Sequence, residues 1–248
     1  MISVIIFLTG LAVGSFLNCV IYRLAIPRGR SFCPFCKHRL SWQDLIPVLS
    51  FFILRGKCRY CRKKISLQYP LVEIATGLLF LLIFNFQFSI FNFIIACFLI
   101  TIFVYDLKHF IIPDKIIFPA IIIALIFNFQ FLISKQFSIF NYSILSAFGA
   151  AIFFLTIVLI SRGKAMGIGD IKLAFFMGLF LGFPNILVAL FLAFLIGAII
   201  GVGLILAKRK TLKSEVPFGP FLVTGIFIAL FWGEKMIGWY FDLFNLTI

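Results

Sequence analysis

The sequence predicts an all-α polytopic membrane protein of about eight transmembrane helices, with one small polar module after the first of them. Of the 248 residues, 63% are hydrophobic and only 12% are charged, and phenylalanine alone accounts for 36. The mean hydropathy of +1.20 is far above what a soluble domain of this length needs to form a core. A lipid bilayer is therefore expected to surround most of the chain.

Apolar runs define the expected helices, with ends good to a few residues. They cover residues 2–22, 70–86, 90–105, 116–133, 142–160, 171–183, 186–206 and 218–233. The first run has no basic region ahead of it and no small-residue cleavage site, so we expect a retained helix rather than a removable signal peptide. The predicted organisation is a first transmembrane helix at 1–22, a polar module at 23–69 and a seven-helix membrane domain at 70–248.

The distribution of basic residues predicts how the chain is oriented. All but Lys135 and Lys235 of the 22 Lys and Arg residues lie in or directly beside four loops. These loops cover residues 23–69, 106–115, 161–170 and 207–217. Basic residues concentrate on the cytoplasmic side of membranes, so we expect these loops in the cytoplasm and both termini outside. The same rule accounts for the net charge of +14, so nucleic acid is not an expected partner.

The first of these loops contains four paired cysteines. Cys33 and Cys36 form one C-x2-C pair, and Cys58 and Cys61 form another. Four thiolates at this spacing suit one tetrahedral zinc ion, and a closed site of this kind is usually structural. Two disulfides or four free thiols are the alternatives, and a reducing cytoplasm disfavours the disulfides. We expect a zinc ion that folds this loop.

Two aspartates at the cytoplasmic ends of different predicted helices are the candidate catalytic pair. Asp170 lies in Gly167-Ile168-Gly169-Asp170-Ile171-Lys172, between two apolar runs. The two glycines are expected to let another backbone approach or to give the turn unusual dihedral angles. The structural alternative is that Asp170 is the N-cap of a helix that begins at Ile171, with the glycines forming the turn before it. Asp106 ends a span that runs inward, where the helix dipole disfavours negative charge and no capping role is available. Two carboxylates that meet can share a proton, one acting as base on a water and the other as acid toward a carbonyl.

Nearby polar residues have simpler expected roles. Asp114 follows a proline and opens a helix, which favours an N-cap. Glu73 lies just inside a helix start and is expected to pair with Arg23 or Lys172, with contact to a substrate or methyl donor as the alternative. Asn18 is expected to hydrogen bond a neighbouring helix, with the same alternative. Lys172 itself is more typical of an interfacial anchor than of a group that tunes the adjacent aspartate.

Gly-x-Gly-Asp-x-Lys, together with an upstream Asp-x7-Asp turn from Asp106 to Asp114, resembles the type IV prepilin peptidases. These form the leader peptidase and N-methyltransferase family of intramembrane aspartic proteases. The likeness extends over nearly the whole chain, with further similar blocks at residues 14–23, 65–73 and 216–220.

The resemblance implies that Asp106 and Asp170 are the catalytic pair, supported by Gly167, Gly169 and Lys172. It implies that the substrates are prepilins or pseudopilins of a bacterial inner membrane. Full-length members carry the cysteine tetrad, which implies a second activity, methylation of the new N-terminal amine with S-adenosylmethionine. No glycine fingerprint for a nucleoside occurs in the sequence, so the methyl donor rests on the resemblance alone.

Two rival functions stay open from the residues themselves. The first is a Gly-x-Gly-Asp membrane protease that cleaves without methylating. The second is a transporter that uses the same carboxylates as a proton relay, because ionisable groups at membrane depth also mark ion pathways.

Overall fold

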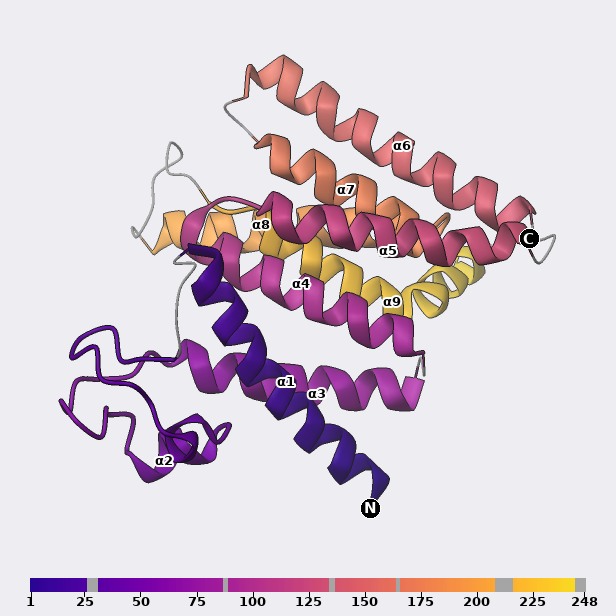
Figure 1. The fold of residues 1–248 in the computed structure, drawn as a ribbon. Coiled ribbons are helices and arrows are strands. Elements are labelled where there is room, and N and C mark those ends of the chain that lie inside the picture. Colours follow the sequence, from indigo (N-terminus) through magenta and orange to yellow (C-terminus); the bar gives the residue numbers. More distant parts are fainter. Residues whose placement is uncertain (26–30, 87–88, 134–136, 164–165, 208–215, 244–248) are drawn as a thin grey trace. The chain divides into compact units, whose positions relative to one another are not determined.

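The structure is a computed structural model that describes residues 1–25, 31–86, 89–133, 137–163, 166–207 and 216–243 (Figure 1). Within these residues the secondary structure is helical, with two isolated β-bridges and no named strand. The chain divides into two compact units, Met1–Thr101 and Ile102–Ile248. The basic residues that we counted at 208–213 lie outside the described part of the chain.

In the described part of the chain, six helices contain stretches long and apolar enough to cross a membrane. They are α1 (Ile2–Ala25), α3 (Gln68–Phe86), α4 (Ile90–His109), α6 (Phe137–Ser161), α8 (Asn185–Leu206) and α9 (Gly219–Leu243). The other two expected runs form α5 (Asp114–Ile133) and α7 (Ile168–Leu181), which fall outside this set. The helical membrane fold is thus confirmed, while the count of eight crossings is approximate. With 14 residues, α7 rises only about 21 Å, against the ~30 Å of a bilayer core.

In the first unit, α1 and α3 cross closely (Figure 1). A Cβ atom on Gly10 would lie 2.7 Å from Gly77 Cα, and one on Gly14 would lie 2.7 Å from Glu73 Cα. Small residues let the two backbones approach, which is how helices associate where lipid removes the hydrophobic driving force. The polar module between these helices contains η1 (Trp42–Leu45) and α2 (Leu49–Ile53).

In the second unit, α7 packs against α5, α6, α8 and α9. Its side chains Leu173, Ala174, Phe176 and Met177 are fully buried. A Cβ atom on Gly178 would collide with the backbone of α6 at Ala147, so this glycine is what allows the two helices to touch. The short helix is therefore enclosed by its longer neighbours, and its N-terminal turn is held at a fixed place among them.

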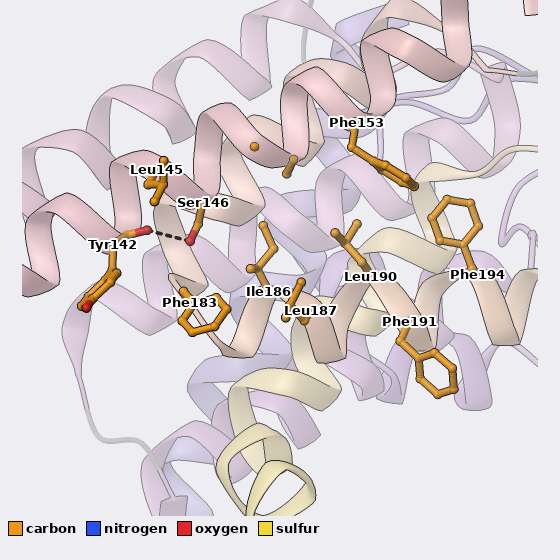
Figure 2. Close-up of a pocket in the computed structure, with 12 residues that line it drawn as sticks. Tyr142, Leu145, Ser146, Phe153, Phe183, Ile186, Leu187, Leu190, Phe191 and Phe194 are labelled. Carbon is orange, nitrogen blue, oxygen red and sulfur yellow. Dashed lines mark hydrogen bonds between the residues drawn. The ribbon is translucent and has the colours of Figure 1, made fainter. Parts of the chain in front are cut away.

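An apolar groove of about 580 Å³ runs along α6 and α8 (Figure 2). Rings of Phe153, Phe183, Phe191 and Phe194 line it, and the Ser146 hydroxyl on its wall donates to the carbonyl oxygen of Tyr142 (2.6 Å). The residues that line it include no carboxylate, and neither Asp106 nor Asp170 is among them.

Candidate active site and metal site

The first turn of α7 holds Asp170. The helix begins at Ile168, and Gly167 before it has extended backbone (φ −85°, ψ 160°). The Asp170 Oδ2 atom accepts a hydrogen bond from the Gly167 N–H (3.0 Å). The expectation of an N-cap for a helix starting at Ile171 is therefore wrong, because the helix starts three residues earlier and Asp170 lies inside it. A negative charge in this turn interacts favourably with the helix dipole.

The two glycines of the motif have different roles. Gly167 has the ordinary φ given above, so it does not serve an unusual dihedral angle. A Cβ atom on Gly169 would lie 3.0 Å from Ile112 Cβ, in the loop that joins α4 to α5. Gly169 thus permits close packing of that loop on α7, against a side chain rather than the backbone that we expected.

Asp106 lies in the last turn of α4, as the sequence predicted, and only 4% of it is exposed. Its Oδ2 atom accepts a hydrogen bond from the N–H of Gly219, the first residue of α9 (3.0 Å). Sequence reasoning placed Asp106 at the C-terminus of α4, where a negative charge is unfavourable. It missed the N-terminus of α9, which also contacts this carboxylate and favours a negative charge. The N-terminal dipole of α9 offsets the effect of the C-terminus of α4.

The two aspartates lie in the same unit and affect each other electrostatically. Asp170 is 8% exposed, so both carboxylates are removed from bulk water. The hydrogen bond that holds each acid uses Oδ2, which leaves Oδ1 of each to meet a water. Such a pair has the composition that proton-sharing hydrolysis requires. The catalytic role of Asp106 and Asp170 itself stays a prediction.

Lys172 does not act as a lone anchor. Its Nζ atom pairs with Asp114 Oδ1 (2.5 Å) and lies 5.1 Å from the ring centre of Phe118. Asp114 is the first residue of α5, and the carbonyl oxygen of Pro113 accepts the first backbone bonds of that helix, so the N-cap expected at Asp114 is off by one. The ion pair joins the starts of α5 and α7, and it removes Lys172 as the expected partner of Glu73.

Asn18 and Glu73 make contacts within the first unit. The Asn18 amide donates to the carbonyl oxygen of Tyr69 (3.1 Å), which ties α1 to α3 as expected. Glu73 Oε2 accepts the N–H of Val48 (2.7 Å), a link that sequence reasoning missed. Val48 has φ +61°, which is costly for a β-branched residue, so Glu73 helps to hold a strained turn of the polar module. Contact of either residue with a substrate or methyl donor stays a prediction.

The four cysteines of the polar module converge. One sulfur from each of Cys33, Cys36, Cys58 and Cys61 lies within 4.8 Å of all the others. Four sulfurs bound ~2.3 Å from one zinc ion lie about 3.8 Å apart. The Cys33 and Cys61 sulfurs are 3.8 Å apart. All six cysteines of the chain are free thiols, so the disulfide alternative is not realised. The geometry fits a tetrahedral metal ion.

Each C-x2-C pair forms the same turn. The N–H of Lys37 donates to the carbonyl oxygen of Cys33 (2.8 Å), and that of Arg62 donates to Cys58 (3.0 Å). Lys37 and Arg62 both have φ +56°. Two equal turns facing each other present their sulfurs from opposite sides, which is the arrangement that a closed four-coordinate site needs.

The turns also prepare the thiols for a cation. Burial opposes ionisation of Cys33, but hydrogen bonds from the backbone N–H groups of Cys36 and Phe35 and from the thiols of Cys36 and Cys58 together lower its pKa to about 7. At Cys36 the N–H of His38 favours the thiolate, but burial and the neighbouring thiols raise the pKa to about 11. The negative charge of one thiolate thus disfavours ionisation of the next thiol. A bound cation would offset this repulsion between the thiolates.

Comparison with known proteins gives consistent results across the chain. The family model described as "Bacterial Peptidase A24 N-terminal domain" matches residues 8–87, and that of the "Type IV leader peptidase family" matches residues 93–202. No solved structure matches.

Curated relatives named "Prepilin leader peptidase/N-methyltransferase" align over nearly their full length. The Legionella pneumophila protein is 34% identical over 94% of this chain and 92% of its own. The Bacillus subtilis protein is 33% identical over 96% of this chain and 98% of its own. The Aeromonas hydrophila protein is 32% identical over 97% and 94%. Identity at this level along the whole chain, with both family models in order, means that this chain belongs to the type IV leader peptidase family.

Proposed function

We propose that this chain is an intramembrane aspartic endopeptidase that removes the leader of prepilin-like proteins and then methylates the new N-terminal residue. The observation that carries the proposal is the pair of buried carboxylates, Asp106 and Asp170, each bound to a helix N-terminus in the second unit. The names of the relatives supply the substrate class and the second activity. The basic loops support a cytoplasmic site, with both termini outside a bacterial inner membrane.

Hydrolysis by this pair needs neither a metal nor a covalent intermediate. The ionised aspartate takes a proton from a water whose oxygen bonds to the peptide carbon, while the protonated aspartate gives its proton to the carbonyl oxygen. The tetrahedral intermediate collapses as the C–N bond breaks: the newly protonated aspartate gives its proton to the leaving amine, and a hydroxyl of the intermediate gives its proton to the other aspartate, which restores the one-proton state of the pair. Exclusion of bulk water from a buried site strengthens each of these electrostatic interactions.

The cysteine cluster supports the second activity by folding the cytoplasmic module around a zinc ion. Cys33, Cys36, Cys58 and Cys61 would hold the metal, which would supply folding free energy rather than chemistry. In the transfer itself, the amine nitrogen bonds to the methyl carbon of S-adenosylmethionine, the carbon–sulfur bond breaks, and the amine loses a proton. Asn18 and Glu73, at the cytoplasmic ends of α1 and α3, are the candidate contacts for donor or substrate.

Co-expression with a prepilin, followed by intact-mass measurement of the product, tests both activities. We expect loss of the leader and a further gain of about 14 Da at the new N-terminus, the mass of one added methylene unit. Asp106→Asn and Asp170→Asn should abolish cleavage. Asp114→Asn is the matched control, because Asp114 is 60% exposed at its side chain and pairs only with a lysine in the described residues.

Each rival function predicts a different result. Cleavage without the added mass would favour a membrane protease that does not methylate. Ion-coupled flux in liposomes without any cleavage would favour a proton-relay transporter and overturn the proposal.

A further inference from the structure

Residues 216–220, Val216-Pro217-Phe218-Gly219-Pro220, form one of the blocks that resemble the prepilin peptidases. The hydrolysis described above gives this segment no role. It forms the start of α9, where the Phe218 carbonyl oxygen accepts the N–H groups of Phe221 (3.0 Å) and Leu222 (3.2 Å). The N–H groups of the first turn of a helix have no partner within the helix. That of Gly219 is satisfied by Asp106 Oδ2, 113 residues earlier in the chain.

A side chain at position 219 would crowd the Asp106 carboxylate. A Cβ atom on residue 219 would lie 2.5 Å from Asp106 Oδ2, 3.1 Å from Cγ and 3.5 Å from Cβ. All three nearest atoms belong to the same short side chain, which is buried. The carboxylate could escape the contact only by rotating away from the N–H that holds it.

Neighbouring residues fix the backbone of Gly219. The ring of Phe218 lies 5.1 Å from that of Phe194, 6.1 Å from that of Phe154 and 6.0 Å from that of Phe221. Phe154 is fully buried. Pro220 restricts φ in the first turn of α9, where its missing N–H costs nothing. The donor is therefore held by packing before any substrate arrives.

We propose that Gly219 is a positioning residue, whose N–H binds Asp106 Oδ2 and whose lack of a side chain lets Asp106 turn Oδ1 toward the water shared with Asp170. The inference rests on the proposed function, since it concerns how one of the two acids is aimed. The start of α9 would then take part in the reaction by orienting Asp106. This segment belongs neither to the Gly-x-Gly-Asp motif nor to the upstream aspartate motif.

Gly219→Ala tests the proposal in the full-length protein with purified prepilin. We expect kcat to fall about 100-fold, the effect of a displacement of roughly 1 Å at a reacting group. KM should stay near the wild-type value, because Gly219 does not bind substrate. Unchanged kcat would overturn the proposal.

Two other glycines of α9 provide matched controls. Gly238→Ala adds a Cβ atom that meets nothing within 4 Å, so it should behave as wild type. Gly225→Ala pushes against the carbonyl oxygen of Ala189 in α8, so it should lower thermal stability without lowering kcat comparably. A loss of kcat in Gly225→Ala equal to that in Gly219→Ala would reduce the Gly219 effect to general helix packing and overturn the proposal.

A double-mutant cycle in thermal stability tests the same contact without an activity measurement. It serves if the Gly219→Ala variant is too unstable to assay. Asp106→Ala removes Oδ2 and Cγ, the two atoms that the new Cβ atom would crowd, and leaves only Cβ at 3.5 Å, an ordinary contact. Gly219→Ala should therefore destabilise the protein much less in the Asp106→Ala background than in the wild type. Equal destabilisation by Gly219→Ala in both backgrounds would refute the close contact between residue 219 and the Asp106 side chain.

The two hypotheses fail in different ways. A wild-type protein that does not cleave prepilin, or an active Asp106→Asn variant, refutes the proposed function. A wild type that cleaves, an inactive Asp106→Asn variant and a fully active Gly219→Ala variant refute the positioning role alone.

Discussion

Replacement of Asp106 by Asn and by Ala should separate the charge of this residue from its hydrogen bond. Asparagine keeps a side-chain oxygen that can accept the Gly219 N–H, whereas alanine leaves this buried donor without a partner. Loss of a helix N-cap costs about 0.5–2 kcal/mol. An unsatisfied buried donor costs about 1–3 kcal/mol. Asp106→Ala should therefore be destabilised by roughly 1–2 kcal/mol, or about 2–8 °C in Tm for a domain of 150–250 residues.

The asparagine variant should be at least as stable as the wild type. It retains the acceptor and removes one of two acids that affect each other electrostatically. Neither variant can accept a proton from water at residue 106, and loss of a general base costs about 10²–10⁴-fold in rate.

Thermal unfolding in detergent and cleavage of purified prepilin, measured on the same preparations, check these expectations. Equal Tm values for the two variants would contradict the hydrogen-bond argument. An Asp106→Asn variant that retains more than about a tenth of the wild-type rate would contradict the catalytic argument.

The remaining predictions concern the metal site, helix packing and pH. Cys58→Ser should lower the zinc content measured by elemental analysis, and an unchanged zinc content would contradict the metal site. The same variant should reduce methylation more than cleavage, because the cysteine cluster and the aspartates lie in different units. Gly178→Ala should destabilise the protein by about 1–3 kcal/mol, because its Cβ atom meets the backbone of α6. Gly149→Ala, which meets nothing within 4 Å, should not, and similar thermal shifts in both would refute the packing argument. Asp44→Asn probes pH dependence. Burial alone would raise the pKa of Asp44, but hydrogen bonds from Ser41 and Arg59 lower it, so the carboxylate stabilises the fold above its unfolded pKa of about 4. The Tm difference between wild type and Asp44→Asn should thus be present at pH 7 and vanish as the pH falls through the lowered pKa; a difference that grows in acid would invert this reasoning.

Several features of the molecule follow from sequence alone because they depend on local patterns. Runs of about 20 apolar residues form helices, since a backbone in lipid must satisfy its hydrogen bonds internally. The spacing within each C-x2-C pair suits a turn that directs two sulfurs to one point, and the four cysteines do converge. The placement of Asp106 in the last turn of α4 also follows from where its apolar run ends.

Other features depend on contacts between distant segments, and sequence reasoning missed them. The N–H of Val48 in the polar module donates to Glu73 Oε2 in α3, 25 residues later in the chain. The partner of Lys172 is Asp114, 58 residues away. No local pattern states which of several acids a lysine will reach.

The environment of Asp106 shows both what sequence predicts and what only tertiary contacts decide. Its sequence position predicts an acid at the unfavourable end of a helix, and that is correct for α4. Only the tertiary structure brings the N-terminus of α9 against the same carboxylate, because a donor left open at one helix end can be satisfied by any buried acceptor that packing places there. Composition determined that this chain is a bundle of membrane helices, and the packing of those helices decided how the Asp106 carboxylate is held.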